Sequence, residues 1–184
     1  MEARPRFPVL RAARIAAGLA WGLSAIHRER VVYGDLGPGR VVLLDGDVPR
    51  LQGLDAPRGR DGMRLRSGLR VPGDPGYLAP EVLRGEPPTP RSDVFSLGCL
   101  LHAMLAGEPP AGRGSPEEVA RTAMLREAPD VGSLRFWVPR ALRRALREML
   151  RLDPSERPDL AGELPSRLEA AAERIARLPW YRYA

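Results

Sequence analysis

The sequence contains neither lysine nor asparagine, although 28% of its 184 residues are charged. All of its basic charge is therefore arginine, which indicates a GC-rich coding bias. The absence excludes every site that needs a lysine ammonium group or an asparagine carboxamide. Only one cysteine is present, Cys99, so an internal disulfide framework is excluded and a reducing compartment is favoured.

Aromatic residues are also scarce, at 5% of the chain, whereas apolar residues reach 43%. This apolar content and the length predict a single domain over residues 1–184 with its own core. The net charge of +6 permits contact with nucleic acid, acidic lipid or an acidic protein. No nucleic-acid recognition motif or interleaved aromatic pattern accompanies that charge, so a nucleic-acid partner is not expected.

Long hydrophobic runs are nearly absent. The run Ile15–Ile26 follows early arginines and could imitate a leader peptide. Its apolar residues share one helical face, however, and the run is too short to span a bilayer. No other segment approaches transmembrane length, and we expect a cytoplasmic protein without a transmembrane segment.

Periodicity and turn residues predict a mainly α fold with a small β-hairpin region. The segment 93–106 is apolar on all sides, which predicts a buried central helix that Ser92 caps and Gly107 ends. The other expected elements are a helix through 15–26, β structure in 31–44 around a loop at 34–40, a strand over 48–54, a mobile loop over 55–72, and helices over 78–83, 117–126, 141–152 and 159–178.

Five motifs follow one another in a fixed order. They are Tyr33-Gly34-Asp35-Leu36-Gly37-Pro38-Gly39-Arg40-Val41-Val42-Leu43, Gly53-Leu54-Asp55, Gly73-Asp74-Pro75-Gly76-Tyr77-Leu78-Ala79-Pro80-Glu81, Ser92-Asp93-Val94-Phe95-Ser96-Leu97-Gly98 and Leu152-Asp153-Pro154-Ser155-Glu156-Arg157-Pro158. In order and spacing they resemble the C-terminal lobe of bacterial-type Ser/Thr protein kinases over residues 8–178. No Gly-rich phosphate loop precedes them, so the N-lobe is expected to be absent.

The resemblance implies a phosphoryl-transfer site at the first two motifs. Asp35 stands at the general-base position of the family. Gly37 replaces the lysine that steadies the transferred phosphate, and Arg40 replaces a metal-binding asparagine. Gly53 replaces the second metal-binding aspartate, unless the loop slips by two residues and Asp55 serves instead.

Asp35 therefore has two interpretations. It is a vestigial general base, or it holds its own loop by accepting backbone hydrogen bonds, as short acidic side chains do in turns. Val42 stands where the family places an aliphatic side chain beneath adenine. No metal site is expected, and ATP with Mg²⁺ is a cofactor only if the site is active.

The resemblance also implies a preserved structural frame. Asp93 matches the aspartate that binds the catalytic-loop backbone, and Glu81 and Arg157 match a buried ion pair. Tyr33 and Leu54 replace the family histidine and phenylalanine with side chains able to fill the same packed column.

Five arginines lie in the segment between Asp55 and Gly73: Arg58, Arg60, Arg64, Arg66 and Arg70. Such a charge run is usually a solvated loop. The alternative is a docking stripe for an acidic or phosphorylated partner, because guanidinium groups bind carboxylate and phosphate in a bidentate manner.

Two functions remain. The first is a pseudokinase, a non-catalytic binding, scaffold or regulatory module. The second is a Ser/Thr protein kinase whose N-lobe is supplied elsewhere or was lost by truncation. In the first case a protein partner, a fused domain or a second copy would cover the apolar surface around Val42 and Leu54.

Overall fold

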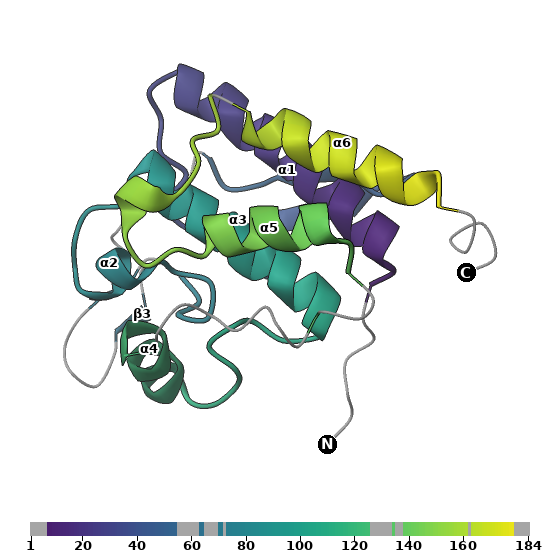
Figure 1. Cartoon of the computed structure of the whole chain (residues 1–184). Helices are drawn as coiled ribbons and strands as arrows, with labels where there is room; N and C mark the ends of the chain where they lie inside the picture. The colour runs from purple at the N-terminus through teal and green to yellow at the C-terminus, as the bar shows by residue number, and fades with distance from the viewer. Residues whose placement is uncertain are drawn as a thin grey trace.

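The computed structural model describes residues 7–54, 63–64, 70–71, 73–125, 134, 138–161 and 163–178 (Figure 1). Its helices are α1 (Val9–Arg28), α2 (Pro80–Leu83), α3 (Pro90–Ala106), α4 (Pro116–Leu125), α5 (Arg140–Met149) and α6 (Leu164–Ala176). Its strands are β1 (Val41–Leu44), β2 (Val48–Leu51), β3 (Met63–Arg64) and β4 (Arg70–Val71), with 3-10 turns η1 (Pro38–Arg40) and η3 (Pro154–Glu156).

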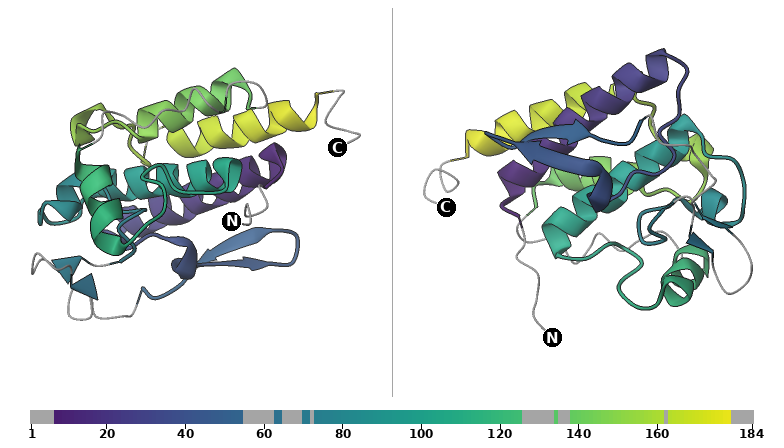
Figure 2. Two further views of the ribbon diagram at one scale, coloured as in Figure 1. Left: turned by 90° about the horizontal axis from the view of Figure 1, so that it is seen from below. Right: turned by 180° about the vertical axis from the view of Figure 1, so that it is seen from behind.

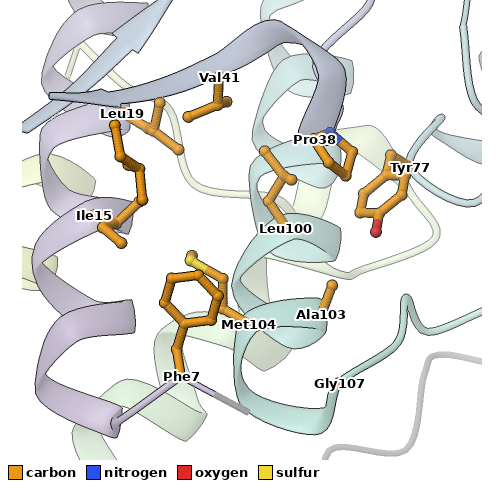
Figure 3. A pocket seen from close by; sticks show the side chains of 11 residues that line it. Phe7, Ile15, Leu19, Pro38, Val41, Tyr77, Leu100, Ala103, Met104 and Gly107 are labelled. Carbon is orange, nitrogen blue, oxygen red and sulfur yellow. The ribbon is translucent and has the colours of Figure 1, made fainter. Parts of the chain in front are cut away.

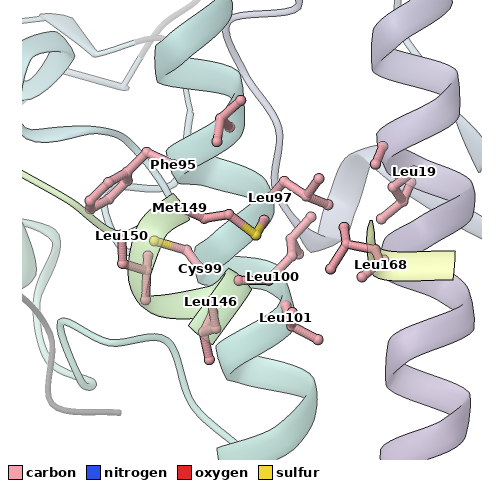
Figure 4. Close-up of a cluster of buried hydrophobic side chains, with 14 of the residues drawn as sticks. Leu19, Phe95, Leu97, Cys99, Leu100, Leu101, Leu146, Met149, Leu150 and Leu168 are labelled. Carbon is pink, nitrogen blue, oxygen red and sulfur yellow. The ribbon is translucent and has the colours of Figure 1, made fainter. Parts of the chain in front are cut away.

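Helix α3 is the centre of the hydrophobic core, as its all-round apolar sequence predicts. Figure 4 shows its side chains meeting those of α5, α6 and α1. The helix begins three residues earlier than expected. Thr89 is its N-cap and forms a capping box with Ser92. The Thr89 hydroxyl accepts from the Ser92 backbone N–H, and the Ser92 hydroxyl accepts from the Thr89 backbone N–H. Gly107 ends it at φ 90°, a left-handed conformation that suits glycine.

Helix α1 is 20 residues long and extends beyond the run Ile15–Ile26 at both ends. By length and composition it could cross a bilayer. More than half of its apolar window is nevertheless buried inside the molecule, where it packs against α3 and α6. Burial in the core explains the apolar composition of α1 equally well, because a helix covered on several sides has few polar positions.

A two-stranded antiparallel hairpin, β1–β2, lies across α1 (Figure 2). Pro49 of β2 sits directly on Gly18 of α1, and a Cβ atom at position 18 would lie 2.7 Å from the Pro49 Cγ. The hairpin is shorter than expected at both ends. Residues 31–36 are not a strand, and β2 ends at Leu51 because the chain turns at Gly53, where φ is +76°.

Several other boundaries differ from the expected ones. Helix α6 begins at Leu164 rather than at residue 159, and α5 ends at Met149. The segment expected to be an irregular loop contains the short pair β3–β4. Ser115 and Glu118 form a capping box at α4.

A buried ion pair ties α2 to the segment that follows α5. The two guanidinium nitrogens Nη1 and Nη2 of Arg157 donate to Oε1 and Oε2 of Glu81 at 2.6 and 2.8 Å, and the Arg157 side chain is fully buried. Its other donors reach the carbonyls of Arg91, Arg151 and Leu152. Burial alone would raise the pKa of Glu81, but the hydrogen bonds from Arg157 and Ser92 bring it below its usual value. The pair is therefore fully satisfied in the folded state.

Breaking this pair should destabilise the fold. Glu81→Gln leaves the Arg157 charge buried without a counter-ion, which should lower the free energy of unfolding by about 3–5 kcal/mol in urea denaturation. Because the pKa of Glu81 is lower in the folded than in the unfolded state, its ionisation stabilises the fold above the unfolded pKa. This stability is lost as the pH falls through the folded pKa. In Glu81→Gln the free energy of unfolding should therefore fall less steeply on acidification.

The matched control is Glu148→Gln, which removes the more exposed bridges to Arg144 and Arg167 and should cost under about 1 kcal/mol. Equal losses in the two variants would contradict a special role for the Glu81–Arg157 pair.

Candidate functional site

The loop that carries Asp35 is held by one buried carboxylate. Asp93, in the first turn of α3, has a side chain only 1% exposed. Its oxygens accept from the backbone N–H groups of Tyr33 at 2.8 Å and Gly34 at 2.7 Å, and His27 Nε2 lies 2.7 Å from Oδ2. The backbone immediately before Asp35 is thereby fixed to the central helix.

Asp35 is paired with Arg40 from the same loop. Arg40 donates through Nε at 2.9 Å and Nη2 at 2.5 Å, both to Oδ2 of Asp35. The turn η1 presents the arginine, since the Arg40 N–H donates to the Gly37 carbonyl and the Arg40 carbonyl accepts from Gln52 N–H. The guanidinium is thus held beside the carboxylate by both its side chain and its backbone.

Gly53 provides the room that the Arg40 side chain needs. A Cβ atom at position 53 would lie 2.7 Å from Arg40 Nη1 and 3.5 Å from its Cζ. Gly53 also has φ +76°, which disfavours other residues. The sequence alone presents Arg40 and Gly53 as two separate departures from the family pattern. In the structure they adjoin each other, and the absence of a side chain at 53 leaves space for the side chain of Arg40.

The second oxygen of Asp35, Oδ1, lies beside the backbone of Gly73. A Cβ atom at Gly73 would overlap Oδ1 of Asp35, so this backbone packs directly against the carboxylate. Nearby, the Asp74 carboxylate accepts from the Gly76 N–H at 2.9 Å. Burial raises the pKa of Asp35, Arg40 opposes that rise by hydrogen bond and charge, and Asp74 adds to it, with a net pKa above the usual value. Asp35 is thus enclosed on two sides.

The donor set does not fit a divalent metal. Within the described ranges, no group of three His, Cys, Asp or Glu side chains could hold a metal ion. A guanidinium cation lies against Asp35, where a metal would need oxygen ligands. Asp55, the alternative ligand, lies outside the described residues.

Leu54 is not part of a packed column, contrary to expectation. Its side chain is 45% exposed, because the positive φ at Gly53 turns the chain away after Gln52. Tyr33 is buried, and its hydroxyl donates to the carbonyl of Gln52. Val42 lies half-buried in β1 opposite Arg50.

The arginine segment is mostly outside the described residues. Arg58, Arg60 and Arg66 lie there entirely, and the structure describes only the strand positions of Arg64 and Arg70, in β3 and β4.

An apolar pocket of about 240 Å³ lies where α1, β1 and α3 meet (Figure 3). Leu100 and Met104 of α3 form one wall, and Phe7 closes one end through its N–H, which donates to the Met104 carbonyl at 2.9 Å. The remaining lining residues are Ile15, Leu19, Pro38, Val41, Leu43, Tyr77, Ala103 and Gly107. Sequence periodicity predicts these side chains as core and gives no signal that they leave a hollow.

A helical body around a buried α3, whose Asp93 anchors an aspartate-bearing loop, is a protein kinase-like fold. Residues 2–166 match the protein kinase domain family, and the chain belongs to that family.

Curated relatives are bacterial. The chain is 32% identical over 161 residues to the serine/threonine-protein kinase PknK of Mycobacterium tuberculosis H37Rv, covering 87% of this chain and 14% of that one. It is 33% identical over 169 residues to the DNA damage-responsive serine/threonine-protein kinase RqkA of Deinococcus radiodurans, covering 91% and 25%. It is 34% identical over 177 residues to the serine/threonine-protein kinase PkaA of Streptomyces coelicolor, covering 95% and 32%. The chain thus spans about a third or less of each relative's length.

The Arg40–Asp35 pair should stabilise the loop in a pH-dependent way. In Arg40→Ala the pKa of Asp35 should rise further, because desolvation and Asp74 then act without the opposing guanidinium. The ionised Asp35 carboxylate should destabilise the fold at neutral pH, and this destabilisation should shrink as acid protonates the carboxylate. Because both groups are partly exposed, the loss at pH 7 should be about 1 kcal/mol by urea denaturation. In an Asp35→Asn background the same change should cost markedly less.

Arg11→Ala is the matched control, since Arg11 makes a similar bidentate pair with Asp47 on the surface. Its effect should not depend on the residue at position 35. Equal costs of Arg40→Ala with and without Asp35 would contradict the coupling.

Proposed function

We propose that this domain is a non-catalytic member of the protein kinase family, a binding, scaffold or regulatory module. The observation that carries the proposal is the guanidinium of Arg40 against Asp35, in space that Gly53 leaves open. In the family, phosphoryl transfer depends on positioning and on charge neutralisation by metal ions. Here the cation beside the aspartate is a fixed part of the chain.

The charge balance supports this proposal. Arg40 already neutralises Asp35, while Asp74 adds a negative charge that acts on the same carboxyl. Gly37 contributes no cation at the position that the resemblance assigns to the phosphate-steadying lysine, and a Cβ there would face open space. A polyphosphate would therefore meet no unpaired positive charge among these residues. The Gly73 backbone also lies against the Oδ1 side of the Asp35 carboxylate.

The second candidate is a Ser/Thr protein kinase whose remaining parts lie elsewhere. Two observations favour it: Asp35 is retained, and the matched relatives carry the name serine/threonine-protein kinase while being far longer than this chain. In that case ATP and Mg²⁺ would be the cofactors.

We further propose that another polypeptide covers the outer end of the β1–β2 hairpin. Leu44 and Val48, which face each other in the register and flank the turn, are 44% and 51% exposed. Light scattering at rising concentration, for the native chain and Val48→Glu, tests a second copy as the cover. Association that Val48→Glu abolishes is the expected result, and a strict monomer would exclude self-association.

A thermal-shift titration with ATP, with and without Mg²⁺, tests the non-catalytic proposal. At about a hundred times its dissociation constant a ligand stabilises by about 2.7 kcal/mol, which raises Tm by roughly 5–10 °C for a domain of this size. We expect no Mg²⁺-dependent shift for the native chain.

The double variant Arg40→Asn with Gly53→Asp is the matched control, because it exchanges the built-in cation for two oxygen ligands. A shift gained by this variant alone would support the proposal. A Mg²⁺-dependent shift of the native chain that Asp35→Ala removes would overturn it and favour the active kinase.

A further inference from the structure

A second hollow, of about 540 Å³, lies between α1 and α6 and shares no residue with the Asp35 site. Four small residues lie along it: Ala17 and Gly18 from α1, and Ala172 and Ala176 from α6. The longer side chains that line it are Arg14, Trp21, Glu169, Glu173 and Arg177. We call this hollow the α1–α6 groove.

The groove arises from the spacing of its residues on two helices. On α1, positions 14, 17, 18 and 21 share one face, and on α6 so do positions 169, 172, 173, 176 and 177. Ala17 and Ala172 leave space open at the middle positions, whereas Pro49 of β2 lies against Gly18. Of the longer side chains, Glu173 lies in the middle and the others flank the groove at its ends. The pattern is the reverse of an ordinary helix contact, in which large apolar side chains fill the middle.

The two ends of the groove differ in charge. Helices α1 and α6 run side by side in opposite directions (Figure 1), so Trp21 and Glu169 lie toward one end and Arg14 and Arg177 toward the other. Glu173 lies between the ends and approaches Arg177 at 3.7 Å. One end therefore offers an aromatic face and a carboxylate, and the other offers guanidinium groups.

Packing in the hydrophobic core does not account for the position of Trp21. Its side chain is 46% exposed, on a helix whose opposite face is buried. Trp21 and Glu169 line the same hollow, and an aromatic ring face and a carboxylate each attract cations. Within the described part of the chain, Glu169 has no hydrogen bond or ion pair that would neutralise it.

We propose that the α1–α6 groove binds a polypeptide segment by its charged side chains. An arginine or lysine of that segment lies over Trp21 and beside Glu169, and an acidic residue of the same segment meets Arg14 and Arg177. The ends of the groove are seven residues apart on α1, which is about 10 Å at the helical rise. An extended segment covers that distance in about three residues, so the recognised pattern is a cation and an acid three positions apart.

The α1–α6 groove contains neither Asp35 nor Arg40. Peptide binding to the groove should therefore be the same in an active and in an inactive kinase domain.

Fluorescence anisotropy of a labelled Gly-Arg-Ala-Ala-Glu-Gly peptide, titrated with the native chain, tests the groove. We expect saturable binding that Glu169→Gln and Trp21→Leu each weaken by roughly five- to tenfold, which corresponds to the loss of one cation contact. The matched control is Glu163→Gln, which alters another exposed acid of the α6 region outside the groove and should leave binding unchanged. A peptide with citrulline in place of arginine should bind as weakly as the Glu169→Gln variant binds the original.

A local readout excludes binding elsewhere. With Trp137→Phe and Trp180→Phe, Trp21 is the only tryptophan left, and its emission should change on titration with the unlabelled peptide. No saturable change up to about 1 mM peptide would overturn the proposal, and so would equal binding of the citrulline peptide. A third outcome is that a chain ending at Leu178 binds the peptide while the full chain does not bind it. This result would identify residues 179–184 as the occupant of the groove and would also overturn the proposal.

Discussion

The carboxylate of Asp93 is the interaction on which the site depends. It is buried at the start of the central helix, and a buried charge is tolerated only when its hydrogen-bonding capacity is met. Two backbone amides of the Asp35 loop and the His27 ring supply that need. The requirement runs both ways: α3 could not bury this charge without the loop, and the loop would have no fixed conformation without α3. The position of Asp35 is therefore a property of the core.

On this base, Arg40 and Gly53 together set the volume and the charge beside Asp35. Arg40 occupies the space that Gly53 leaves without a side chain, and its guanidinium balances the Asp35 carboxylate. The Glu81–Arg157 pair and the Asp93 contacts involve neither residue, so these contacts of the frame do not depend on them.

Much of the fold could be predicted from the sequence. The all-round apolar run showed α3 as buried, and alternating turn and apolar residues located the hairpin. The packed role assigned to Leu54 was wrong, because the direction of a side chain after a glycine depends on a φ angle that the sequence does not specify. The fit of Arg40 beside Gly53 escaped prediction for a related reason. Volumes that compensate across thirteen positions of chain are visible only when the turn between them is known. The α1–α6 groove was missed because small residues on a helix predict close packing as readily as a hollow.

Gly18 belongs to two surfaces at once. Pro49 of the hairpin rests on it, and it is also one of the small residues of the α1–α6 groove. Any larger residue there would lift the hairpin and narrow the groove in a single step. The two surfaces therefore cannot diverge independently during evolution at this position, and a lineage that remodels one of them inherits the consequence at the other.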